Sequence, residues 1–136
     1  MCLPGRVSVR ARGPHKAYAL YAHITWATRW RARTVCRGDV ETVAGAVQRA
    51  AERHTVHVLA QAVLTEHVHV LVSYRPDTAL SDFVRDAKSE SSRLVGENAK
   101  WGRGYYAGSV CANHVAVTRR YIARQHAHHP HLIPPG

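Results

Sequence analysis

Two histidines one residue apart are the first candidate chemical groups, at His67 and His69 in the stretch EHVHVLVS. Side chains alternate between the two faces of a β-strand, so both imidazoles would project from one face while Val68 and Val70 pack on the other. Such a strand presents two metal ligands on a rigid support. The competing interpretation is a chance match, because the chain contains eleven histidines. The spacing indicates half of a metal site, which needs a third ligand.

A tyrosine and a glutamine four residues apart form the second candidate pair, in the stretch RRYIARQ. Residues at this spacing share one face of a helix, so Tyr121 and Gln125 would lie side by side. Gln125 offers a carbonyl oxygen to a hard divalent cation, and Tyr121 offers a hydroxyl nucleophile. The alternative is that Tyr121 packs in the core and Gln125 is solvated. Spacing alone leaves both interpretations open.

The charge of the chain indicates the class of partner. Its 136 residues include 19 Lys and Arg against 9 Asp and Glu, a formal net charge of +10. Such an excess is typical of proteins that bind nucleic acid, and less often of those that bind an anionic membrane surface. A generally arginine-biased proteome is the alternative explanation.

Cysteine usage and hydropathy indicate the compartment. The three cysteines, Cys2, Cys36 and Cys111, lie far apart, and an odd number without metal-ligand spacing argues against a disulfide framework or a zinc finger. The basic N-terminal stretch lacks the apolar segment of a secretory signal, and no apolar run approaches membrane-spanning length. We therefore expect a cytoplasmic protein without a membrane partner.

Hydrophobic periodicity predicts the order strand, helix, two strands, helix, strand, helix. We expect Asp39 and Asn113 to cap the first and last helices, and a hairpin turn at Thr65 and Glu66. An antiparallel sheet with packed helices gives an α+β fold, and the first six elements match the ferredoxin-like order. The expected strands are 18–27, 55–64, 66–74 and one entered through 101–110; the helices are 38–54, 77–96 and 113–125. The expected organisation is a flexible basic arm at 1–16, one domain at 17–128 and a frayed tail at 129–136.

An ordered set of stretches carries a resemblance to a known family. HITWATRWRARTV, EHVHVLVS, AKSESSRLV, WGRGYYAGSV and VTRRYIARQ occur in this order between Tyr18 and Gln125. Together they resemble the single-tyrosine HUH transposases of small insertion sequences, including the REP-associated tyrosine transposases. The chain departs from the family pattern in having Glu66 where Asp is frequent, and in the residues ANHVAV that begin the last helix.

The resemblance implies roles for particular residues. It implies that the HUH motif lies on a central strand at His67 and His69, that Tyr121 on the C-terminal helix is the nucleophile, and that Gln125 completes the metal site. The implied reaction cleaves and rejoins single-stranded DNA through a 5′-phosphotyrosine, with recognition of hairpin ends. A homodimer whose subunits share their active sites is also implied. An amide ligand with open positions favours Mg²⁺ or Mn²⁺ over Zn²⁺.

Basic and aromatic residues near these positions are the candidate DNA contacts. Arginines bind phosphate, and exposed aromatic rings stack on unpaired bases. Trp30 and Tyr106 share this character, although half of such residues are expected to be ordinary surface or core. The proposed DNA-binding set is Arg29, Arg31, Arg33, Lys88, Arg93, Trp101, Arg103 and Tyr105.

Three other functions compete with this one. A domesticated DNA-binding protein of the same fold would bind single-stranded or hairpin DNA without cleaving it. An RNA-binding ferredoxin-like module would display aromatic residues on its central strands, where this chain displays histidines. A zinc-structured protein lacks the required cysteine pairs.

Overall fold

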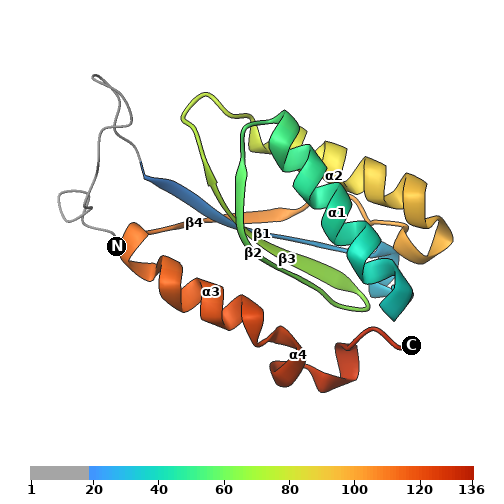
Figure 1. Cartoon of the computed structure of the whole chain (residues 1–136). Helices are drawn as coiled ribbons and strands as arrows, with labels where there is room; N and C mark the ends of the chain where they lie inside the picture. The colour runs from blue at the N-terminus through green and yellow to red at the C-terminus, as the bar shows by residue number, and fades with distance from the viewer. Residues whose placement is uncertain (1–18) are drawn as a thin grey trace.

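A four-stranded antiparallel sheet forms the centre of the computed structural model, which describes residues 19–136 (Figure 1). The expected arm at 1–16 lies outside the described residues. The strands are β1 (Leu20–Ala27), β2 (His57–Val63), β3 (His67–Tyr74) and β4 (Tyr106–Val110). Their order across the sheet is β2-β3-β1-β4, and every neighbouring pair is antiparallel. The ferredoxin-like α+β prediction is confirmed.

Helices α1 (Arg37–Arg53) and α2 (Leu80–Val95) cover one face of the sheet (Figure 1). The alternating valines Val68, Val70 and Val72 of β3 point into this layer and are fully buried. Phe83 of α2 belongs to the same core and is the largest of the fully buried side chains within residues 19–136. Strand β3 lies inside the sheet, between β2 and β1. Because side chains alternate along a strand, burial of these valines fixes which residues of β3 face away from α1 and α2.

The starts of the two helices differ from the sequence prediction. Cys36 occupies the N-cap of α1, and Asp39 lies three residues later with its carboxylate accepting a hydrogen bond from the Cys36 N–H at 2.9 Å. Asp39 therefore closes a capping box from inside the first turn instead of capping the helix itself. Helix α2 begins at Leu80 rather than at Asp77, and ends before Gly96, whose φ of 88° suits glycine.

Helix α3 (Val115–Ala123) lies on the opposite face of the sheet, against β2 and β3 (Figure 1). Asn113 does not cap it, since the N-cap is His114 and makes no side-chain capping bond. The predicted single helix through Gln125 is also wrong: the backbone leaves helical geometry at Arg124 (φ −101°, ψ 11°), and α4 (Gln125–His128) follows. Ile122 is buried and anchors α3 to the sheet.

The C-terminal segment is packed against the domain, contrary to the expectation of a frayed tail at 129–136. Leu132 is buried, and its carbonyl accepts a hydrogen bond from the Thr65 N–H at 2.8 Å. The Pro135 carbonyl accepts another from the Arg37 N–H at 2.7 Å. The tail thus closes the β2–β3 turn and the start of α1. Within residues 19–136 no helix is long and apolar enough to span a membrane.

Candidate active site

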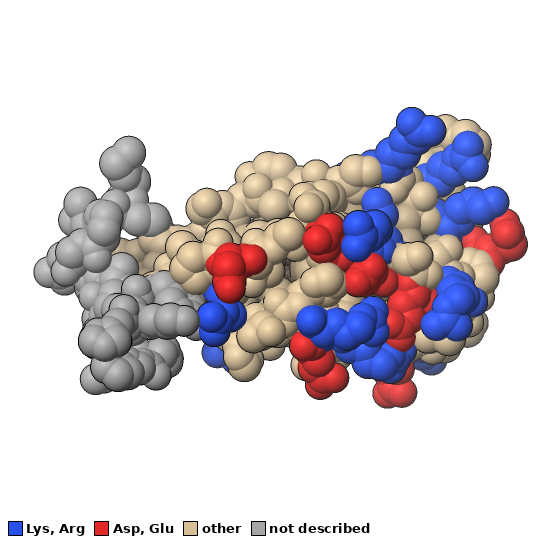
Figure 2. Space-filling view, turned by 90° about the horizontal axis from the view of Figure 1, so that it is seen from above, with Lys and Arg blue, Asp and Glu red and all other residues tan. Residues whose placement is uncertain are grey.

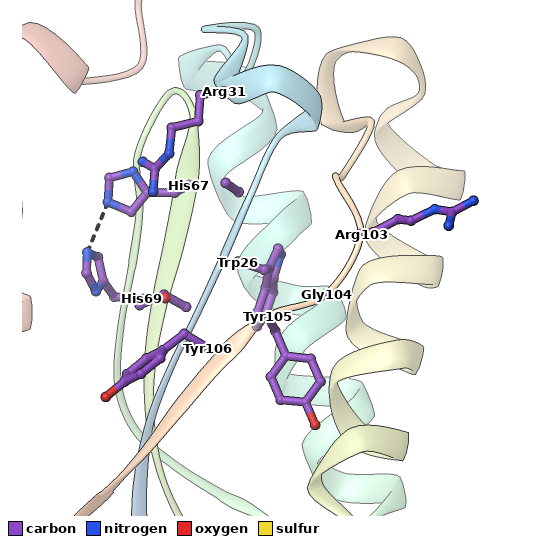
Figure 3. Close-up of a pocket in the computed structure, with 10 residues that line it drawn as sticks. Trp26, Arg31, His67, His69, Arg103, Gly104, Tyr105 and Tyr106 are labelled. Carbon is purple, nitrogen blue, oxygen red and sulfur yellow. Dashed lines mark hydrogen bonds between the residues drawn. The ribbon is translucent and has the colours of Figure 1, made fainter.

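The two candidate ligands on β3 face each other. His67 Nε2 and His69 Nε2 are 3.0 Å apart, and both rings lie on the face opposite α1 and α2 (Figure 3). Two nitrogens bound to one ion at about 2.1 Å, at roughly a right angle, are about 3 Å apart. The geometry of the pair therefore fits two ligands of a single divalent cation.

Burial keeps these imidazoles neutral, as metal binding requires. Burial first, and then the charges of His67, His23 and His129, together lower the pKa of His69 to about 3. Burial also lowers the pKa of His67, assisted by Arg31 and opposed by Glu66. Both rings are therefore unprotonated near neutral pH and can offer a nitrogen lone pair.

Gln125 supplies an unsatisfied oxygen next to this pair. Its side chain is 0% exposed, so the solvated alternative is excluded. The amide nitrogen donates to the Tyr121 carbonyl at 3.2 Å, while Oε1 is buried without a hydrogen-bond partner. The amide is also close enough to His69 to raise that residue's pKa, against the effect of burial. A buried orphan acceptor of this kind is what a hard cation would satisfy.

A candidate metal site with three protein ligands would need the amide of Gln125. Residues 19–136 contain no cluster of three or more His, Cys, Asp or Glu side chains suited to a metal ion. The structure thus favours two imidazoles and one amide oxygen over a zinc-type set. We find that this donor set fits a hard divalent cation.

Tyr121 lies over the same cluster and belongs to the same chain. Its ring centroid is 6.1 Å from that of His69 and 5.7 Å from that of His128. The side chain is 43% exposed, which excludes the alternative of a core tyrosine. Although the helix breaks at Arg124, Tyr121 and Gln125 still reach one site. The hydroxyl is accessible to a substrate that approaches the histidines.

His23 is a member of the cluster that the sequence interpretation missed. Its Nε2 lies 2.9 Å from Nδ1 of His69. When His69 Nδ1–H donates to His23, the lone pair of His69 Nε2 is left to face His67, so His23 selects the ligating tautomer. A signal was available: Ala22, Ile24 and Trp26 form the buried side of β1, which puts His23 on the histidine side.

A cavity of about 430 Å³ opens beside the two histidines (Figure 3). Helix α3 covers β2 and β3, whereas the cavity lies along β1 and the start of β4. Tyr106 points into it next to His69, while Tyr105 and Arg103 line its outer edge and extend away from the histidines. Tyr106 thus lies closer to the chemistry than the predicted Tyr105.

Glu66 organises the basic residues at one end of this cavity. It is nearly buried and pairs with Arg31, whose guanidinium lies 2.7 Å from its carboxylate. Arg33 lies 3.8 Å from the other carboxylate oxygen. Both arginines therefore remain at the site, held by the residue that precedes His67 in the chain.

Several predicted DNA contacts have other contacts instead. The Lys88 ammonium donates to the carbonyls of Gly102 and Gly104 at 2.8 and 2.9 Å, and burial lowers its pKa. The indole N–H of Trp101 donates to Ser91 at 2.9 Å. Lys88 and Trp101 thus shape the segment that leads into β4.

Arg29 and Arg93 lie in different surroundings. The Arg29 guanidinium stacks 4.4 Å from the centroid of the Trp30 ring, in the segment that also holds Arg31. Arg93 is exposed on α2, in the helical layer on the far side of the sheet from the histidines. The structure therefore separates Arg93 from Arg31, which lines the cavity beside the histidines.

Charge is distributed unequally between the two sides of the sheet. The outer surface of α1 and α2 mixes acidic and basic residues (Figure 2), with ion pairs such as Arg53 to Glu90 at 3.1 Å. No acidic residue follows Glu97 in the sequence. Within residues 19–136, no ion pair engages the three arginines on and after α3, which are Arg119, Arg120 and Arg124. The Tyr121 side is the better surface for a polyanion.

Comparisons with known proteins identify similar transposases. The chain is 27% identical over 127 residues to the ISDra2 transposase TnpA of Deinococcus radiodurans, covering 85% of this chain and 90% of that protein. It is 25% identical over 122 residues to the transposase of insertion sequence element IS200 from Salmonella typhimurium, covering 82% and 80% of the two chains.

Two solved structures share the fold. A REP-associated tyrosine transposase bound to a REP hairpin matches with a TM-score of 0.70 at 16% identity, over 86% of this chain and 74% of that one. A Deinococcus radiodurans R1 protein assigned as a transposase matches with a TM-score of 0.65 at 22% identity, over 85% and 98%. The model of the family described as "Transposase IS200 like" matches residues 16–125. This match covers most of the chain and confirms the predicted family: the protein belongs to the IS200-like transposases.

Proposed function

We propose that this transposase cleaves and rejoins single-stranded DNA with Tyr121 as its nucleophile. The observation that carries the proposal is one cluster that contains Tyr121, the facing nitrogens of His67 and His69, and the orphan oxygen of Gln125. An accessible hydroxyl next to a candidate cation site is suited to attack on a phosphodiester.

The proposed reaction has two balanced steps. Tyr121 Oη attacks phosphorus, the bond from phosphorus to O3′ breaks, and the phenol loses a proton while the departing O3′ gains one. The product is a 5′-phosphotyrosine and a free 3′ hydroxyl. The 3′ hydroxyl of another strand then attacks, the bond from phosphorus to Oη breaks, and the phenol regains its proton. No nucleotide triphosphate is consumed, because the phosphotyrosine conserves the bond.

His67, His69 and Gln125 are the residues that would hold a divalent cation, for which Mg²⁺ or Mn²⁺ suits the donor set. Such a cation would supply Lewis-acid stabilisation of the charge that develops on the non-bridging phosphate oxygens. His23 holds His69 in its ligating tautomer. Glu66 and Lys88 are poorly placed as general bases, because each is committed to other contacts.

We propose that the site is assembled within one chain. Tyr121 reaches the histidines of its own chain, and the buried Ile122 anchors the helix that carries it. A dimer that exchanges this helix is therefore not required to complete the cluster. We propose that each chain provides one complete active site.

The proposed substrate is a single-stranded segment beside a DNA hairpin. The net charge of +10 and the unpaired arginines near Tyr121 support a polyanionic substrate. One of the similar structures is a REP-associated tyrosine transposase bound to a REP hairpin, which makes hairpin DNA the natural probe.

The test is formation of a covalent protein–DNA adduct. Purified protein is incubated with pooled, labelled hairpin oligonucleotides that carry single-stranded flanks, with Mn²⁺ or with EDTA, and adducts are resolved under denaturing conditions. We expect a Mn²⁺-dependent adduct that disappears in Tyr121→Phe and persists in the matched control Tyr106→Phe. DNA binding without any adduct would support the non-cleaving alternative, and an adduct that persists in Tyr121→Phe would contradict the assigned nucleophile.

A further inference from the structure

Trp30 is an exposed aromatic residue in the segment between β1 and α1. Its side chain is 85% exposed, whereas Trp26 is buried and Trp101 is partly buried. A large apolar ring in this position gains little from folding. Its exposure therefore calls for an explanation outside the fold.

The backbone holds this ring outward in a strained conformation. Trp30 and Arg31 both have left-handed φ values, 57° and 54°, which residues other than glycine rarely adopt. The turn around them is closed by hydrogen bonds from Arg31 N–H to the Thr28 carbonyl at 2.9 Å and from Ala32 N–H to the Arg29 carbonyl at 3.1 Å. Strain that is maintained by its surroundings is a frequent feature of binding sites.

The same turn is attached to two neighbouring segments. The Arg29 N–H donates to the Lys100 carbonyl at 2.9 Å, and Thr28 N–H donates to the Glu66 carbonyl at 2.7 Å. The Arg31 side chain binds the Glu66 carboxylate and lines the cavity that contains His67. Trp30 therefore lies in a turn that is hydrogen-bonded to two neighbouring segments, and it directly precedes Arg31, which lines the cavity of the candidate active site.

One basic side chain lies against the exposed ring. The Arg29 guanidinium stacks 4.4 Å from its centroid, and Arg31 follows it in the chain. At an exposure of 85% the ring remains open to a further stacking partner. An aromatic ring beside a cation matches a nucleobase beside a phosphate.

We propose that Trp30 is a stacking platform for one unpaired nucleobase of the strand that enters the cavity. The proposal rests on single-stranded DNA being the substrate. It adds Trp30 as the residue that stacks on a base beside the candidate active site. Arg29 contacts the adjoining phosphate. The strained turn fixes the ring in advance, so little ordering is needed when DNA binds.

Tryptophan fluorescence and affinity test the platform without any need for cleavage. An oligo(dT) strand is titrated into wild type, Trp30→Ala and Trp30→Phe in EDTA. Stacking should quench wild-type tryptophan emission. Trp30→Phe should bind nearly as tightly but lose the quenching, and Trp30→Ala should bind about 5- to 150-fold more weakly. Because the side chain is exposed, the circular dichroism and melting temperature of both variants should match wild type.

An abasic strand of the same length separates stacking from charge. Wild type and Trp30→Ala should bind this strand equally, since it offers phosphates but no base. Equal affinity of the two proteins for oligo(dT), or quenching that survives in Trp30→Phe, would overturn the platform. The adduct assay is a separate measurement: wild type that forms no adduct but shows the Trp30-dependent affinity would reject cleavage and retain the platform.

Discussion

The two faces of the sheet bury different types of side chain. Under α1 and α2 the core around Val68, Val70 and Phe83 is mainly aliphatic and aromatic. Within residues 19–136, its buried polar atoms without a partner are the Trp26 Nε1 and the Gln61 Oε1. Under α3 the buried groups include His69 and Gln125, and one buried amide oxygen has no partner. The first face is suited to stabilising the fold, and the second is suited to binding.

The difference shows how one strand serves both purposes. Alternation along β3 sends its valines into the core and its histidines to the other side. The valines keep the strand rigid, so the two imidazoles hold their spacing. Burial without protonation costs stability on the histidine side, and the core on the other side offsets that cost.

The comparison is tested most strongly by removing one histidine from each side. His67→Ala should reduce cleavage by roughly 1,000-fold or more, since Lewis-acid stabilisation is worth several kcal/mol. The matched control is His54→Ala in the helical layer, where His54 pairs with Asp86 at 2.6 Å. Adduct yield and Mn²⁺ affinity by calorimetry should fall only in His67→Ala. Equal losses in the two variants would contradict the division.

Truncation of the core should affect the whole fold. Phe83→Ala should lower the free energy of unfolding by about 3–5 kcal/mol, because it leaves a cavity under α2.

Ile122→Ala should instead release α3 locally and expose the Tyr121 amide to hydrogen exchange, with β3 still protected. Urea unfolding and hydrogen exchange measure the two effects. Global loss of protection in Ile122→Ala would refute the separation.

Acid should destabilise the histidine side. The pKa of His69 is about 3 in the folded protein against 6.5 in the unfolded chain, so only the unfolded chain takes up a proton between these values. The stability that depends on neutral His69 is complete above pH 6.5 and is lost as pH falls toward 3. At about pH 5 the loss is roughly 2 kcal/mol. Urea unfolding of metal-free protein should show this difference from about pH 7, and His69→Asn should show less.

Neutralising arginines should have the smallest effects. Removal of one phosphate contact should lower the salt slope of single-strand binding by about 0.7 units. We expect this for Arg120→Gln, on the Tyr121 side, and no change for Arg93→Gln, on α2. Affinity measured across a salt series distinguishes them. A lower slope in Arg93→Gln would place DNA on the helical layer.

Much of the fold and the central pair could be predicted from the sequence. The alternation around His67 and His69 is a local pattern, and it fixes the face of each side chain once the valines are buried. The strand order follows from short connections and from the helices that pack on one face. Tyr121 and Gln125 were assigned by family resemblance, and the structure brings both to the histidines.

The features that the sequence did not predict depend on contacts between segments that are distant in the chain. His23 is 46 residues from His69 along the chain, and their contact follows from the pairing of β1 with β3. Lys88 has the composition of a DNA contact, yet two backbone carbonyls bind it. The tail was misjudged because its polar sequence hides Leu132, which fills a site that only the folded β2–β3 turn creates.

Peptide mapping of a trapped protein–DNA adduct tests the central claim most directly. The chain contains six tyrosines, of which Tyr121 lies over the histidine pair and Tyr106 lines the adjoining cavity. After digestion of the Mn²⁺-dependent adduct, the account predicts a 5′-phosphonucleotide on the peptide that contains Tyr121 and on no other. A modified peptide that contains Tyr105 or Tyr106, or that lacks tyrosine, would contradict it.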